Sequence, residues 1–226
     1  MLDNYEAVAR MRSAVVASVE SGSMPPWQAA EGCNDYEDNY ALSEVQKATI
    51  IDWVAQGAPE GNEADYVAAP APTTTLSRTD VTLTMPVDYS PQGRPDDYRC
   101  FLLDWPEDRE RYVTGFAVDP GNRQAVHHVI AFLIKPNLVE RFRAKDAAED
   151  GPGYTCFGGP GELADGVDWL GSWAPGGRPA DLPEGTGIRV QPGSVIAMQV
   201  HYNTLTAEPE WDRTSIRFRI DDAAEI

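Results

Sequence analysis

Apolar residues near the start of the chain recur at intervals of three and four, which is the spacing of one face of an α-helix. This pattern predicts a helix over Asp3–Gly22. Its apolar face consists of Val8, Met11, Val15 and Val19. A second helix is predicted to begin at Ser43, because Ser43 and Gln46 fit a capping box, and to end at Gly57. Residues 1–57 are therefore predicted to be a short helical segment.

The pattern changes beyond residue 78, where short runs of β-branched and aromatic residues alternate with clusters of turn residues. No helical periodicity is visible between these runs. The strand-like runs are Val81–Met85, Tyr98–Leu103, Arg111–Val118, Val126–Ile134, Gly187–Val190, Val195–Tyr202 and Ser215–Ile220. Residues 79–226 are predicted to form a jelly-roll β-sandwich, so the fold is expected to be mainly β. Residues 58–78, rich in Pro, Ala and Thr, are predicted to be a linker.

The chain is strongly acidic. Its 226 residues include 36 Asp and Glu against 18 Lys and Arg, a formal net charge of −18, and 42% of the residues are hydrophobic. An acidic surface repels phosphate groups and anionic lipids, so we expect neither a nucleic acid nor a membrane as partner. The longest unbroken apolar run, Val129–Ile134, is far too short to span a bilayer. The acidic pairs Asp96–Asp97 and Asp221–Asp222 are expected to be solvated loop charges.

The three histidines of the chain all lie in the predicted β part. His127 and His128 are neighbours in one strand-like run, where alternation predicts that they point to opposite faces. One would then be a core histidine and the other partly exposed. The same alternation places His201 on the less apolar face of its strand, together with Gln199. Because three imidazoles without a carboxylate fit copper or zinc best, a shared metal site is the alternative to a structural role.

Several separated motifs of the β part follow one another in a definite order. They are Tyr98-Arg-Cys-Phe101, Val113-Thr-Gly-Phe116, Val126-His-His-Val129, Tyr154-Thr-Cys156, Trp173-Ala-Pro175, Leu182-Pro-Glu-Gly-Thr-Gly-Ile-Arg-Val190 and Met198-Gln-Val-His-Tyr-Asn203. In type and order they resemble the N-terminal half of the catalytic core of copper type II, ascorbate-dependent monooxygenases. Peptidylglycine α-hydroxylating monooxygenase and dopamine β-monooxygenase belong to that family. The resemblance covers residues 79–226.

The resemblance implies a ligand set and a disulfide. By position, His127, His128 and His201 correspond to the residues that bind the electron-donating copper of the family. For both adjacent imidazoles to reach one ion, the strand must bulge or twist locally. Cys100 and Cys156 correspond to a disulfide pair, which implies an oxidising compartment, and a periplasmic or secreted location is therefore expected.

The N-terminal segment is similar to the C-terminal part of a c-type cytochrome domain, which some bacterial relatives carry in front of the copper core as an electron donor in cis. The axial haem ligand of such a domain would correspond to Met24. The chain has no C-x-x-C-H motif, so haem c is expected only if an upstream segment supplies it. In this chain Met24 is instead expected to be buried between two helices. Cys33 has no visible disulfide partner.

In the family, a second β-domain carries an H-x-H pair and a Met that bind the copper where oxygen and substrate react. No histidine follows His201 in this sequence. We therefore expect a fragment that holds the electron-donating half of the enzyme and is inactive alone. Because no signal peptide is visible, the true N-terminus is expected to lie upstream of Met1.

Two functions are compatible with these features. The first is part of a monooxygenase that hydroxylates C–H bonds of a small-molecule or peptide substrate with O₂ and ascorbate. The alternative is a non-enzymatic copper-binding or interaction module on a jelly-roll scaffold.

Overall fold

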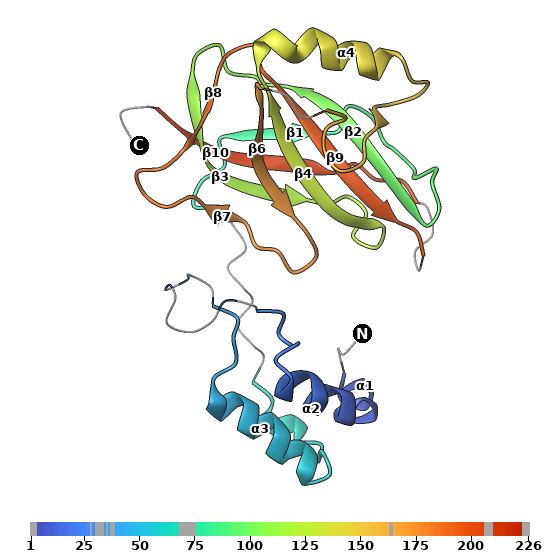
Figure 1. Cartoon of the computed structure of the whole chain (residues 1–226), viewed down its shortest axis with the longest axis vertical. Helices are drawn as coiled ribbons and strands as arrows, with labels where there is room; N and C mark the ends of the chain where they lie inside the picture. Colours follow the sequence, from blue (N-terminus) through green and yellow to red (C-terminus); the bar gives the residue numbers. More distant parts are fainter. Residues whose placement is uncertain are drawn as a thin grey trace. The chain divides into compact units, whose positions relative to one another are not determined.

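The computed structural model describes residues 4–27, 29, 34, 36, 39–67, 76–162, 165–205 and 210–222, and Figure 1 draws the whole chain. Cys33 lies outside the described residues. The chain divides into two compact units, Met1–Pro70 and Ala71–Ile226. No helix among the described residues has the length and apolar character that crossing a bilayer requires.

The first unit contains helices α1 (Tyr5–Arg10), α2 (Arg12–Glu20) and α3 (Glu44–Ala55), and a 3₁₀ turn, η1 (Glu63–Asp65). The single helix predicted for the first segment is wrong in detail. It is broken at Met11, whose φ of −101° and ψ of 11° leave the helical region. The predicted capping box of α3 is confirmed, because Ser43 and Gln46 each bond to the other's backbone N–H.

Met24 was expected to be buried between two helices, and this expectation is wrong. Its side chain is 56% exposed. It lines a surface hollow together with Met11, at the break between the first two helices, and Val15 of α2. The short helices leave this hollow open, so Met24 covers apolar surface rather than filling an interior gap.

The second unit is a β-sandwich of two antiparallel sheets. The described residues form ten strands, seven of which were predicted from the sequence. One sheet has the order β1-β10-β3-β7, with β8 also paired to β3, and the other has the order β5-β2-β9-β4-β6. The strands are β1 (Val81–Thr84), β2 (Asp96–Asp104), β3 (Arg111–Asp119), β4 (Val126–Ile134), β5 (Tyr154–Thr155), β6 (Val167–Trp173), β7 (Ala180–Asp181), β8 (Ile188–Val190), β9 (Val195–Asn203) and β10 (Ser215–Asp221).

The main core lies between the two sheets. Alternate residues of β9, including Met198 and Val200, meet Ile216 and Phe218 of β10, and all four are fully buried. The intervening residues of β9 point to the other side of their sheet. The sandwich therefore leaves one face of the β5-β2-β9-β4-β6 sheet available for a second set of contacts.

That second face is partly covered by helix α4 (Val139–Ala147), which the sequence did not predict (Figure 1). Val139 and Phe142 of α4 belong to a second apolar cluster with Ala197 of β9 and with Cys100 and Cys156. This cluster occupies one end of the sheet face, and the histidines lie on the same face nearer the other end of β9.

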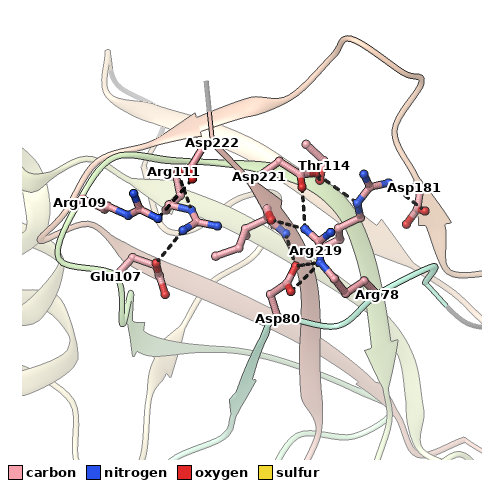
Figure 2. A network of polar contacts seen from close by, with 11 residues as sticks. Arg78, Asp80, Glu107, Arg109, Arg111, Thr114, Asp181, Arg219, Asp221 and Asp222 are labelled. Carbon is pink, nitrogen blue, oxygen red and sulfur yellow. Dashed lines mark hydrogen bonds and ion pairs between the residues drawn. The ribbon is translucent and has the colours of Figure 1, made fainter. Parts of the chain in front are cut away.

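The expectation of a solvated loop charge is wrong for Asp221, whereas Asp222 follows β10 and its side chain is 44% exposed. Asp221 is 4% exposed and lies at the end of β10, where it accepts hydrogen bonds from Thr114 of β3 and from Arg78 (Figure 2). These bonds lower the pKa of the Asp221 carboxyl although its burial opposes the shift. The network ties the last strand to its neighbour and to the segment that precedes β1.

Candidate metal centre

A β-bulge on β4 brings the two adjacent histidines toward the same neighbour. Val126 pairs with Tyr202 of β9, and His128 pairs with His201. Two steps along β4 therefore match one step along β9, which makes His127 the extra residue of the bulge. In a regular strand the two side chains would point to opposite faces. Here the ring centroids of His127 and His128 lie 4.8 and 4.7 Å from that of His201.

The ring nitrogens are close enough to share one ion. The Nδ1 atom of His128 lies 3.4 Å from that of His127 and 3.3 Å from that of His201. Two ligand atoms at about 2.0 Å from one ion, with a tetrahedral angle between them, are about 3.3 Å apart. One ligand atom from each of the three residues lies within 4.8 Å of the other two. This donor set fits an ion that accepts three imidazoles, and it is the only such group among the described residues.

His201 is oriented by a carboxylate on the side away from the other two rings. Its Nε2 lies 2.8 Å from Oδ1 of Asp96, which also accepts a hydrogen bond from Asn203. A carboxylate accepts, so Nε2 carries the proton and Nδ1 keeps its lone pair for a metal. The hydrogen bond from His201 is the main cause that lowers the pKa of Asp96, and that from Asn203 adds to it.

The sequence did not assign this role to Asp96. The pair Asp96–Asp97 was expected to be solvated loop charge, and the structure contradicts that expectation. Both residues belong to β2, and Asp97 accepts hydrogen bonds from the Tyr89 hydroxyl and the backbone N–H of Gln92. A signal existed in principle, because β2 begins and β9 ends near the predicted metal site, but their antiparallel register could not be read from one sequence.

Tyr98 covers one face of the His201 ring. The two rings are stacked, with centroids 4.0 Å apart and an interplanar angle of 3°. Phe157 in turn meets Tyr98 edge to face at 4.9 Å. The stack and the Asp96 hydrogen bond together restrict rotation of His201, which is only 5% exposed.

The position of His128 favours its neutral form. It is half-buried between the other two histidines, and this burial lowers its pKa below the ordinary value. The neighbouring charges of His201 and His127 lower the pKa further, while a hydrogen bond with Gln199 opposes the shift. Neutral imidazole is the form that binds metals, so the lowered pKa of His128 favours metal binding.

Gln199 connects the histidines to the disulfide. Cys100 and Cys156 are bonded, with Cα atoms 5.9 Å apart. The buried Gln199 amide donates to the carbonyl oxygens of Cys156 and Gly159 at 3.0 and 2.8 Å. The disulfide thereby holds the loop that fixes Gln199, whose side chain contacts His128.

Comparison with known protein families gives a domain match. The N-terminal domain of copper type II ascorbate-dependent monooxygenases matches residues 81–209. The chain belongs to this family. A comparison with curated protein sequences gives no significant match. The residues matched to the monooxygenase domain include all three histidines and both bonded cysteines, so the site described above lies wholly within the family's copper domain.

Proposed function

We propose that this chain is the copper-binding, electron-donating domain of an O₂- and ascorbate-dependent monooxygenase that hydroxylates C–H bonds. His127, His128 and His201 would hold a single copper ion. Copper bound there supplies one-electron chemistry, because it is stable as both Cu(I) and Cu(II). Family membership and the three converging imidazoles support the proposal.

Each residue of the site has a separate task in this proposal. Asp96 holds the proton on Nε2 of His201, so that Nδ1 is available as a ligand. Tyr98 keeps the His201 ring in its plane and shields it from water on one face. His127 is exposed, and it therefore gives solvent and a reductant access to the centre.

The bulge at His127 is the observation that carries the proposal. A bulge interrupts the hydrogen-bond ladder and leaves the extra residue unpaired, so it lowers the stability of the strand pair. At this position it also moves His127 beside His128 and His201. Shared metal binding accounts for both the bulge and the convergence, whereas a structural role for one buried histidine accounts for neither.

Copper stoichiometry tests the proposal. The purified chain should bind one copper ion per molecule, and the alanine variants of His127, His128 and His201 should each weaken binding at least about tenfold. Gln124→Ala is a matched control, because this exposed polar residue lies just before β4 and outside the histidine cluster. Near-ultraviolet circular dichroism should confirm that each variant is folded. Unchanged affinity in folded His127→Ala and His201→Ala would contradict the proposal.

An activity assay distinguishes an electron-donating domain from a complete enzyme. All three histidines of the chain contribute to one cluster, so no imidazole remains to build a second copper site. We expect ascorbate to reduce the bound copper, with no hydroxylated product from O₂ and either a peptide or a phenethylamine substrate. Product formation, or two copper ions per chain, would show that a second site has been overlooked.

A non-enzymatic copper-binding module is the second candidate. The convergence of the three histidines favours it as well. A module of this kind would bind copper, but ascorbate would reduce the bound copper only slowly. For either candidate we propose a periplasmic or secreted location, supported by the disulfide. Detection of the protein in the extracytoplasmic fraction of its native cells would support this location, and detection only in the cytoplasm would contradict it.

A further inference from the structure

A cavity of about 870 Å³ adjoins the histidine cluster without including it. Two of its lining residues, Asp96 and Tyr98, are the residues that contact His201. Cavities of this size are typical of small-molecule sites. A ligand bound here would touch the hydrogen-bond partner and the stacking partner of a metal ligand, but would not touch a histidine.

Four of the residues that line the cavity are aromatic. Tyr89 and Tyr98 line it from within, and Phe157 and Trp211 line it while remaining 79% and 71% exposed. Their faces suit an apolar ligand, a cation, or a ligand that combines the two.

The charges of the lining residues favour a cationic ligand over an anionic one. Four carboxylates line it, those of Asp88, Asp96, Asp97 and Asp150, against the one arginine, Arg99. The difference, four minus one, leaves a formal charge of −3 on the lining residues, or −2 when Arg213, which pairs with Asp88 at 3.2 Å, is counted as well. The chain as a whole carries −18, so the surrounding field also attracts cations.

The guanidinium of Arg99 is turned toward the neighbouring loop. It donates to Glu149 at 2.8 Å and to the carbonyl oxygens of Pro152 and Gly153 at 3.1 and 2.9 Å. These bonds occupy the groups with which an arginine would bind an anion. An anionic ligand such as ascorbate therefore finds no free cation in this cavity.

We propose that this cavity binds a small organic cation with an aromatic or aliphatic body, and that its occupancy is sensed at the metal centre through Asp96 and Tyr98. The binding step stands on the cavity alone, whereas the sensing step rests on the proposed copper function. A cation beside Asp96 draws electron density away from the carboxylate that supports His201. Bound copper would then favour Cu(I), and its reduction potential would rise.

Binding is tested on the metal-free protein, independently of copper. The probe is benzyltrimethylammonium, whose nitrogen has no lone pair and cannot ligate a metal, and benzenesulfonate is the anionic counterpart. A ligand-observed NMR titration should give a dissociation constant of about 1 mM for the cation, as expected for a ligand of this size. No binding should be detected for the anion. Equal binding of both probes, or of neither, would overturn the proposal.

Variants locate the bound probe. Trp211→Ala removes an exposed aromatic wall and should weaken binding about fivefold, and Asp150→Asn should weaken it in the same direction. Trp169→Ala is the matched control, because Trp169 is also exposed, at 61%, but does not line the cavity. All three side chains are exposed, so their replacement is not expected to affect folding. An equal loss in Trp169→Ala would overturn the assignment to this cavity.

The second arm uses the copper-loaded protein. Saturating probe should raise the reduction potential of the bound copper in the wild type, and Trp211→Ala should show no rise at the same probe concentration. A probe that binds without shifting the potential would overturn the sensing step and leave the binding site. Failure to load copper would contradict the proposed function, while the metal-free titration would still decide the binding site.

Discussion

At the scale of single residues, the site depends on which nitrogen of His201 carries the proton. Histidine presents two nitrogens, and the one that faces a metal is set by the hydrogen bond that the other makes. Asp96 makes that bond at 2.8 Å, and Asn203 holds the same carboxylate oxygen at 2.9 Å. The ligand geometry of His201 is thus fixed before any metal arrives.

Replacing the carboxylate should therefore weaken copper binding without removing a ligand. We expect Asp96→Asn to lower copper affinity about 10–100-fold, because an amide donor at this position favours the tautomer with its proton on Nδ1. Asp108→Asn, an exposed residue with the same charge change, is the control. Copper titration against a chelator of known affinity measures the effect. Equal affinity of Asp96→Asn and wild type would show that Asp96 does not orient His201.

A second carboxylate lowers the stability of the fold at neutral pH. Burial raises the pKa of Asp146, and its Oδ1 atom has no hydrogen-bond partner among the described residues. A carboxyl whose pKa is raised on folding stabilises the protein below the unfolded pKa and loses this contribution as pH rises through the folded pKa. Asp146→Asn should therefore raise the free energy of unfolding at pH 7 by about 0.5 kcal/mol, a small value because solvent partly screens the group.

The gain should disappear near pH 3, where the wild-type carboxyl is already protonated. Urea unfolding at the two pH values measures it, with Asp108→Asn as the control for the change in net charge. A gain of equal size at both pH values would assign the effect to something other than ionisation of Asp146.

At the scale of elements, the sequence predicted seven of the strands, including the three-residue β8, and missed β5, β7 and the seven-residue β6. The seven predicted strands have clear runs of β-branched and aromatic residues, whereas β5 and β7 contain two residues each. Helix α4 buries only Val139 and Phe142, so its apolar face is too sparse to show a helical period. These elements form because they pack against the folded sheet, and such tertiary contacts cannot be read from the local sequence.

The metal site was predictable in composition but not in its surroundings. Family motifs indicated the three histidines and the need for a bulge, but the register that makes His127 the extra residue depends on pairing with β9. Asp96 and Tyr98 reach His201 only because β2 lies beside β9 in antiparallel register. Contacts between strands that are about a hundred residues apart leave no local pattern in one sequence.

Copper should cross-link β4 and β9, and the melting temperature measures this link. A ligand that binds only the folded state at 100 times its dissociation constant adds about 2.7 kcal/mol, which corresponds to a rise of about 5–10 °C for a domain of this size. His127→Ala should melt near the wild-type temperature without copper, because His127 is exposed and outside the strand ladder. With copper it should show much less of the rise. A full rise in His127→Ala would show that His127 is not a ligand.

The disulfide stabilises the face of the sheet on which the histidines lie. It closes a separation of 56 residues, and loss of such a link costs about 4 kcal/mol in the chain-entropy model. Cys100→Ala/Cys156→Ala should therefore lower the melting temperature by roughly 10 °C. Thiol titration of the unfolded, unreduced wild type should find at most one thiol, since the chain has three cysteines and two are bonded. Three thiols would contradict the disulfide.

At the scale of the whole molecule, the second unit carries the family match, the disulfide and the candidate metal centre. The net charge of −18 favours cations at the surface of the chain, including metal ions. The donor set then restricts the choice of ion, because three imidazoles suit copper or zinc, and family membership favours copper. The account depends on those three rings binding one ion.

X-ray absorption at the copper edge of the loaded wild type tests this claim most directly. The account predicts one shell of nitrogen ligands at about 2.0 Å, with the multiple scattering of three imidazole rings and no sulfur ligand. His127→Ala should lose one ring from that spectrum. A wild-type spectrum with fewer than three imidazoles, or one that is unchanged in both His127→Ala and His201→Ala, would contradict the proposed copper centre.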